Sequence, residues 1–138
     1  MSVDLPHGEW GRSDSEGPLR QCIKELRGLG FEAHLFIGDS TSQPIIESVK
    51  AHAPFDCVFI DANHTENNVR TDFTNYGRLG KYVCFHDIAW KRVPKPTRLP
   101  IEVPKVWADI KQTFKDKAKF REISHHHDDN GIGILEWI

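Results

Sequence analysis

The chain has 138 residues, the length of one ordinary domain, and the sequence therefore predicts a single domain over residues 1–138. Its 18 Lys and Arg residues nearly balance 20 Asp and Glu residues, giving a formal charge of −2. This balance argues against nucleic-acid and anionic-membrane surfaces and favours small molecules or proteins as partners. No apolar run approaches the roughly 18 residues of a membrane span. Two of the three cysteines, Cys57 and Cys84, lie inside apolar runs, and we expect a soluble, cytoplasmic protein with reduced thiols.

Strands and helices alternate along the first part of the chain. Apolar residues recur at three- and four-residue spacing after Pro18, which predicts a helix that Gly28 and Gly30 end. Thr41 or Ser42 is placed to cap the next helix. The predicted order is a strand at 2–5, a polar loop at 7–17, the Pro18 helix, a strand at 31–37 and a helix ending near 53–54.

The second part continues the alternation and contains two continuous apolar runs. Cys57–Ile60 and Tyr82–Phe85 lack the polar alternation of a half-exposed strand, which predicts strands buried on both faces. The predicted order is a strand ending before Asp61, a helix at 65–76, a strand ending at His86, a long loop at 91–104, a helix at 102–117, and strands at 119–124 and 131–137 around a polar turn.

This order predicts an α/β domain with helices on both faces of a mostly parallel sheet and an antiparallel C-terminal strand. Ligands of open parallel sheets bind outside the carboxyl ends of the strands. Asp61, His64, His86 and Asp87 all follow or end the two apolar runs. We therefore expect these four ionisable side chains to converge on one crevice.

Several motifs of the sequence occur together in one known family. They are Asp4 within 3–6, Gly38 to Ser40, the run 55–64, Asp72, Phe85 to Asp87 and the closing run 131–135. Together they resemble the class I S-adenosylmethionine-dependent methyltransferases. The resemblance covers nearly the whole chain and is strongest to the metal-dependent O-methyltransferases that act on macrolide sugars and to cephalosporin-hydroxylase-like proteins. It implies a Rossmann-like sheet and an activity on a hydroxylated small molecule.

The resemblance implies that three residues of the first part bind the cofactor S-adenosylmethionine. Asp4 matches the acid that accepts hydrogen bonds from both ribose hydroxyls, which a carboxylate can do at once. Asp39 matches the residue that contacts the adenine amino group, with Ser40 stacked beside it. Each acid has an alternative interpretation as a strand-end turn or a helix cap.

The resemblance also implies a metal and a base. Asp61 and the pair His86 and Asp87 match the ligands of Mg²⁺ or another divalent ion, for which carboxylate oxygens are suitable. His64 matches the general base, close to a hydroxyl acidified by the metal. His86 stands where many relatives carry an acid, which favours a softer ion or an empty site. The alternative is that these residues satisfy backbone groups at strand ends.

One part of the family pattern is missing from the sequence. A methyltransferase of this class has a strand and a Glu-x-Gly-x-x-x-Gly turn before the ribose acid, and nothing before Val3 matches them. The chain is then a fragment, or the flanking strands pair directly, or a homo-oligomer or a missing N-terminal segment completes the sheet. Three functions stay open: an O-methyltransferase, an inactive remnant that serves in binding or assembly, and a metal-dependent hydrolase.

Two further clusters are conspicuous. Residues 125–129 read His-His-His-Asp-Asp and predict either a transition-metal site or a solvated turn, and the turn is favoured because adjacent residues point in different directions. The basic residues of the loop at 91–104, near Trp90, predict either a clamp for an anionic substrate or a solubilising segment. These basic residues are Lys91, Arg92, Lys95 and Arg98.

Overall fold

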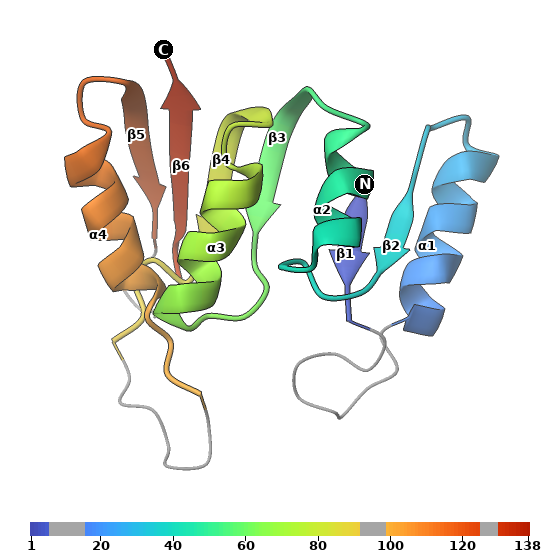
Figure 1. Ribbon diagram of the computed structural model, residues 1–138, viewed down its shortest axis with the longest axis horizontal. Helices are drawn as coiled ribbons and strands as arrows, with labels where there is room; N and C mark the ends of the chain where they lie inside the picture. The colour runs from blue at the N-terminus through green and yellow to red at the C-terminus, as the bar shows by residue number, and fades with distance from the viewer. Residues whose placement is uncertain (6–15, 92–98, 125–129) are drawn as a thin grey trace. The chain divides into compact units, whose positions relative to one another are not determined.

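The computed structural model describes residues 1–5, 16–91, 99–124 and 130–138 (Figure 1). It divides the chain into two compact units, Met1–Val49 and Lys50–Ile138, here called unit 1 and unit 2. Among the described residues, every helix is too short or too polar to cross a lipid bilayer.

Unit 1 contains two short parallel strands and two helices. Its elements in chain order are β1 Ser2–Asp4, α1 Glu16–Gly28, β2 Leu35–Ile37 and α2 Gln43–Lys50. Ser2 pairs with Leu35, and Asp4 pairs with Ile37. The strand predicted at 31–37 is therefore too long, because β1 offers only three residues as partners. The carbonyl of Ala33, just before β2, instead accepts a hydrogen bond from Nε of Arg27 at 2.8 Å.

Unit 2 is a four-stranded sheet with two helices. The sheet order is β3-β4-β6-β5, with β3 parallel to β4, and with β6 antiparallel to both β4 and β5. The parallel ladders of both units and the antiparallel C-terminal strands confirm the predicted α/β class. The elements are β3 Phe55–Ile60, α3 Glu66–Tyr76, β4 Gly80–His86, α4 Val103–Thr113, β5 Ala118–Ile123 and β6 Ile132–Trp137.

Helices α3 and α4 both cover the same face of this sheet (Figure 1). Val83, Phe85 and Leu135 project from that face and are fully buried. Trp107 of α4 packs on it directly over Gly133, where an added Cβ would lie 2.7 Å from the indole ring. The close approach of the indole to the backbone explains why β6 carries glycine at this point. Side chains from three sequence-distant elements thus form one core.

The opposite face of β3 and β4 is more open than the apolar runs predict. Cys57 is exposed, Phe59 is 53% exposed, and Tyr82 and Cys84 are half-buried. The prediction that β3 is buried on both faces is therefore wrong. Among the described residues β3 pairs only with β4, and both helices of unit 2 lie on the other face, so Cys57 and Phe59 lack cover within this unit.

Candidate metal and base site

The site forms where β3 and β4 end. The two strands are parallel, and Ile60 pairs with Phe85 near their carboxyl ends. Asp61 follows β3 directly, and His86 is the last residue of β4. The register therefore places Asp61 beside His86, and His86 Nδ1 lies 3.3 Å from Asp61 Oδ1. Parallel pairing alone is enough to bring an acid and an imidazole from distant parts of the sequence together.

His64 and Asp87 complete a closed ring of alternating imidazoles and carboxylates. His64 Nε2 lies 3.2 Å from Asp61 Oδ1 and 3.4 Å from Asp87 Oδ2. His86 Nδ1 lies 3.1 Å from Asp87 Oδ1. One oxygen of Asp61 thus faces both imidazoles, whereas Asp87 turns a different oxygen toward each. The structure brings the four predicted residues together, and their chemical roles stay predictions.

Asp87 is held in an unusual conformation. Its φ is 61°, in the left-handed region that few residues other than glycine adopt, although Asp tolerates it better than most. The backbone N–H of Trp90 donates to the Asp87 carbonyl at 3.3 Å, so the chain reverses immediately after β4. The Asp87 side chain is only 7% exposed. This backbone geometry turns a carboxylate inward at the end of a strand, at a cost of order 1 kcal/mol.

Two polar atoms of the ring are buried and incompletely satisfied. His86 Nδ1 and Asp87 Oδ1 are near each other, yet neither makes a hydrogen bond of adequate geometry with the described residues. A buried carboxylate oxygen in this state costs free energy unless a cation or donor satisfies it. A positive ion between the side chains would satisfy both atoms. The orphaned pair therefore fits a cation site.

The donor set also fits a divalent metal. Asp61, His64 and His86 each offer one ligand atom, and these atoms lie within 4.8 Å of one another. Two carboxylates and two imidazoles provide the mixed oxygen and nitrogen set that suits Mn²⁺, Fe²⁺ or Zn²⁺ better than Mg²⁺. His64 is as close to Asp61 as His86 is, so it is placed to serve either as a ligand or as a base.

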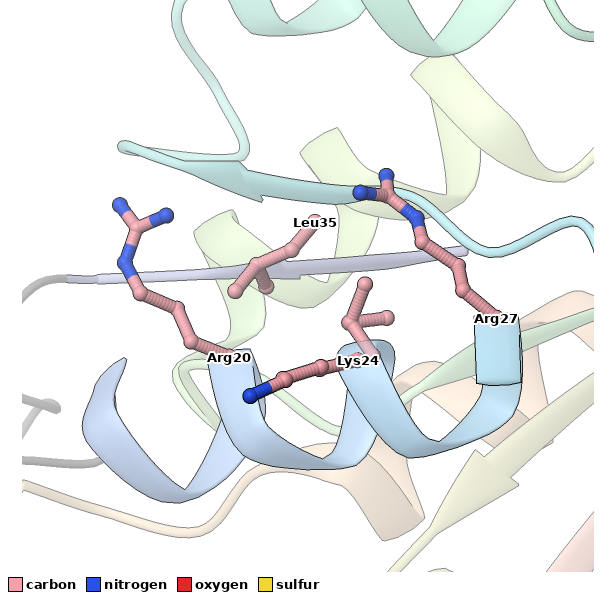
Figure 2. A pocket seen from close by; sticks show the side chains of 5 residues that line it. Arg20, Lys24, Arg27 and Leu35 are labelled. Carbon is pink, nitrogen blue, oxygen red and sulfur yellow. The ribbon is translucent and has the colours of Figure 1, made fainter. Parts of the chain in front are cut away.

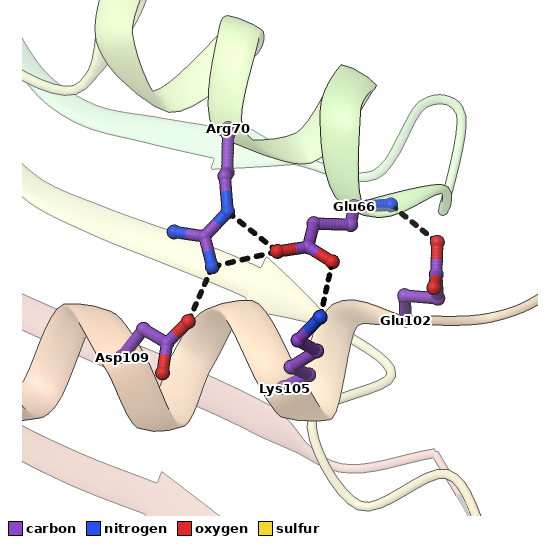
Figure 3. A network of polar contacts seen from close by, with 5 residues as sticks. All are labelled: Glu66, Arg70, Glu102, Lys105 and Asp109. Carbon is purple, nitrogen blue, oxygen red and sulfur yellow. Dashed lines mark hydrogen bonds and ion pairs between the residues drawn. The ribbon is translucent and has the colours of Figure 1, made fainter.

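Glu102 fixes the loop that carries His64 and the start of α3, where Figure 3 shows its carboxylate beside the backbone N–H of Glu66. Its backbone N–H donates to the His64 carbonyl at 2.9 Å. Its carboxylate accepts a hydrogen bond from the backbone N–H of Glu66 at 2.8 Å. Thr65 at the N-cap of α3 makes no side-chain capping bond. The Glu102 carboxylate, at the start of α4, supplies the capping acceptor for α3 in its place. Sequence patterns missed Glu102, because only the packing of α4 beside α3 reveals it.

A charged network joins α3 to α4 next to this loop (Figure 3). The Glu66 carboxylate accepts hydrogen bonds from Lys105 and from Arg70, which also pairs with Asp109. The hydrogen bond from Lys105, and then that from Arg70, lowers the pKa of Glu66. The hydrogen bond to Glu66 raises the pKa of Lys105, and the hydrogen bonds to Asp109 and then to Glu66 raise the pKa of Arg70. The network lies at the surface and mainly orients the two helices.

The predicted cofactor residues lie in unit 1 at the carboxyl ends of β1 and β2. Asp4 ends β1, and its Oδ1 accepts a hydrogen bond from the backbone N–H of Leu5 at 2.8 Å. Asp39 Oδ1 accepts hydrogen bonds from both the backbone N–H and the hydroxyl of Thr41, each at 2.8 Å. Both acids therefore make the local turn contacts that the alternative interpretation requires. Ser40 lies between Asp39 and Thr41 and is half-buried.

Unit 1 also has a basic pocket of about 250 Å³ between α1 and β2. Figure 2 shows Arg20, Lys24 and Arg27 projecting from α1 around it, with Leu35 on the strand side. None of the predicted site residues lines it. Two further predictions lie mostly outside the described residues. These are the cluster at 125–129 and the loop residues Arg92, Lys95 and Arg98. Lys91, the remaining basic residue of that loop, is described and exposed.

Comparison with known proteins supports the fold. No protein-family model matches the sequence, and no protein of curated function matches it. The structure is similar to a caffeoyl-CoA O-methyltransferase-like protein from Staphylococcus aureus, with a TM-score of 0.56 and 18% identity over 97% of this chain and 63% of that one. It also matches the MycE methyltransferase of the mycinamycin pathway, solved with Mg and SAH, with a TM-score of 0.47 and 18% identity over 75% of this chain and 31% of that one.

The chain thus spans less than two thirds of the length of the Staphylococcus aureus protein. At this identity the likeness shows shared architecture, and function must be argued from the site. The chain thus shares its α/β, Rossmann-like fold with the Staphylococcus aureus O-methyltransferase-like protein.

Proposed function

We propose that the chain is part of an S-adenosylmethionine-dependent O-methyltransferase that uses a divalent metal to act on a hydroxylated small molecule. The ring of Asp61, His64, His86 and Asp87 is the observation that carries this proposal. It lies at the carboxyl ends of parallel strands in a methyltransferase-like fold, where such sheets bind ligands. A bound cation would satisfy its two buried unpartnered atoms, His86 Nδ1 and Asp87 Oδ1.

Each residue of the ring has a distinct proposed role. Asp61, His86 and Asp87 would hold the ion, which when bound polarises a substrate hydroxyl as a Lewis acid. His64 would accept the hydroxyl proton, and the carboxylates of Asp61 and Asp87, which face its Nε2, would stabilise the imidazolium that results. The Glu102 contact keeps the His64 loop in place and limits the motion of this base.

The cofactor would be bound by residues of unit 1. Asp4 and Asp39 lie at the ends of paired parallel strands, and each carboxylate uses one oxygen for a local turn contact. Asp4 would accept hydrogen bonds from the ribose hydroxyls, and Asp39 from the adenine amino group, with Ser40 beside the ring. A carboxylate has enough lone pairs to combine a turn contact with a ligand contact.

Calorimetric titration of the purified chain with Mn²⁺, Zn²⁺ and Mg²⁺ tests the metal site. We expect Mn²⁺ or Zn²⁺ to bind more tightly than Mg²⁺, because one of the three proposed ligands, His86, is an imidazole. Asp61→Asn should weaken binding at least tenfold. Asp116→Asn, at an exposed aspartate between α4 and β5, is the matched control and should bind like the parent. Equal, weak binding of all three ions by parent and variants would exclude the metal site.

The role of His64 needs its own variant. His64→Gln should leave metal affinity within about threefold if His64 is the base, and lower it at least tenfold if it is a ligand. Circular dichroism of each variant checks that the chain stays folded. A loss of metal binding would move His64 into the ligand set and leave the proposed base without support.

Titration with S-adenosylmethionine tests the cofactor site independently of the metal. Micromolar binding that Asp4→Ala weakens would support the proposal. A folded chain that binds metal and no cofactor would favour the inactive remnant. Hydrolysis of a test ester without cofactor, abolished by Asp87→Asn, would favour the metal-dependent hydrolase instead.

A further inference from the structure

Two of the three cysteines touch each other on the open face of the unit 2 sheet. Cys57 lies on β3 and Cys84 on β4, and their sulfur atoms are 3.6 Å apart. Cys57 is exposed and Cys84 is half-buried. The third cysteine, Cys22, lies in α1 of unit 1. Buried cysteines that serve only as small apolar side chains need no such contact and no access to solvent.

The two thiols have different environments. The two sulfurs are in hydrogen-bond contact, in which either can be the donor. Cys57 is exposed, whereas Cys84 is half-buried. An oxidant in solution reaches Cys57 first, with a second thiol waiting in contact.

We propose that Cys57 and Cys84 form a reversible intramolecular disulfide when the protein meets a peroxide. The Cys57 sulfur attacks one peroxide oxygen, the O–O bond breaks, and Cys57 becomes a sulfenic acid as one water leaves. The Cys84 sulfur then attacks the Cys57 sulfur. The S–S bond forms, the S–O bond breaks, and the hydroxyl leaves as a second water with the Cys84 proton. Two thiols and one peroxide give one disulfide and two waters.

The register shows why this disulfide would be easily reduced. Cys57 pairs with Tyr82, and Cys84 pairs with Phe59, so the two cysteines are diagonal rather than opposite neighbours. Bond formation must bring the sulfurs to about 2.05 Å, and a diagonal placement favours strain. Among the described ladders β3 is bonded on one side only, so only its ladder with β4 resists an adjustment of this strand. Strained, exposed disulfides are the reducible, regulatory kind.

The position of the pair gives the bond a consequence. Asp61 follows Cys57 on the same chain segment, and His86 ends the strand that carries Cys84. A bond between the strands would restrain the two segments that lead to the candidate site. Oxidation would therefore act on the site without involving any of its residues.

Peptide mapping after native oxidation tests the proposal. The Cys22→Ser chain is treated with hydrogen peroxide, alkylated in denaturant and digested without reductant. We expect a linked peptide pair containing Cys57 and Cys84, loss of both alkylatable thiols, and full recovery with glutathione. In the intact chain Cys22 should stay alkylatable. Cys57→Ser and Cys84→Ser should each abolish the linked peptides.

Other products would overturn the proposal. Two alkylatable thiols after oxidation would show that the pair does not react. Cys57 sulfinic acid without a linked peptide, or covalent dimers in place of the internal bond, would show that Cys84 does not resolve the sulfenic acid. Because Cys22→Ser leaves both paired residues intact, a folding defect at the pair cannot mask the result.

Discussion

Unit 1 and unit 2 bury very different amounts of apolar surface. In α1 no residue is buried, and Leu29 and Phe31 beyond it are 75% and 62% exposed. In unit 2, by contrast, one continuous cluster includes Phe85, Trp107 and Leu135, all 2% exposed or less. Burial of apolar surface is the main favourable term in folding. The candidate metal residues therefore lie on the well-packed scaffold, and the candidate cofactor residues on the thinly packed one.

Truncation of a core side chain should show this contrast at its largest. Trp107→Ala in unit 2 should lower the free energy of unfolding by about 3–5 kcal/mol, because it removes the ring that packs on Phe85 and Phe120. Ile23→Ala in unit 1, at a half-buried position, should cost less than about 1 kcal/mol. Urea unfolding monitored by circular dichroism measures both. Equal costs would show that α1 is as firmly packed as α4.

Glycine substitutions should give opposite signs in the two units. Gly133→Ala should destabilise the protein by about 1–3 kcal/mol, since its Cβ would meet the Trp107 indole at 2.7 Å. Gly28→Ala, at the end of α1, meets nothing within 4 Å and removes a helix-weakening glycine. It should be neutral or stabilising by up to about 1 kcal/mol. A destabilised Gly28→Ala would reveal packing against α1.

The sequence was enough to predict that the four site residues lie together, but it did not reveal the contacts that hold them in place. Asp61 and His86 were placed together because the ends of parallel strands meet at one sheet edge. Glu102 holds the His64 loop and accepts a hydrogen bond from Glu66, which lies 36 residues away in the sequence. No local sequence pattern marks Glu102 for this role. Its role depends on how α3 and α4 pack.

The exposure of β3 could not be predicted for a related reason. An apolar run shows that a strand suits a sheet interior, but it does not say which faces are covered. Cys57 and Phe59 belong to such a run and are nevertheless exposed, because both helices of unit 2 lie on the other face. The length of β2 likewise depended on its partner, since β1 is only three residues long.

Loss of the long-range cap should have an effect of intermediate size. Glu102→Ala leaves the first N–H of α3 without its acceptor and should cost about 1 kcal/mol. The backbone N–H of Glu102 still donates to the His64 carbonyl in this variant, and His64 is the proposed base, so the Kd for Mn²⁺ should stay within about threefold of the parent value. Asp39→Ala removes the local turn contact in unit 1 and should likewise leave Mn²⁺ affinity unchanged. Urea unfolding measures the loss of stability, and Glu102→Gln, which keeps an acceptor, should restore most of it.

A surface ion pair should contribute least, even in unit 2. Hydrogen bonds from Lys111 and then from Trp107 lower the pKa of Glu122 below its ordinary value of 4.5. The charged carboxylate therefore stabilises the fold fully above that value, and the contribution is lost as the pH falls through the lowered pKa. The Glu122 side chain is 46% exposed, so Glu122→Gln should cost only about 0.5 kcal/mol at pH 7.

The pH dependence distinguishes this effect from lost packing. The difference between parent and Glu122→Gln in the free energy of unfolding should shrink as the pH falls below 4.5 and the parent carboxylate also becomes neutral. Lys111→Gln should reproduce the same pH profile, because it removes the largest cause of the pKa shift. A difference that stays constant from pH 7 to pH 3 would mean that Glu122 acts through the Trp107 ring rather than through charge. Glu122 would then contribute to stability through the tightly packed core of unit 2, as Trp107 does.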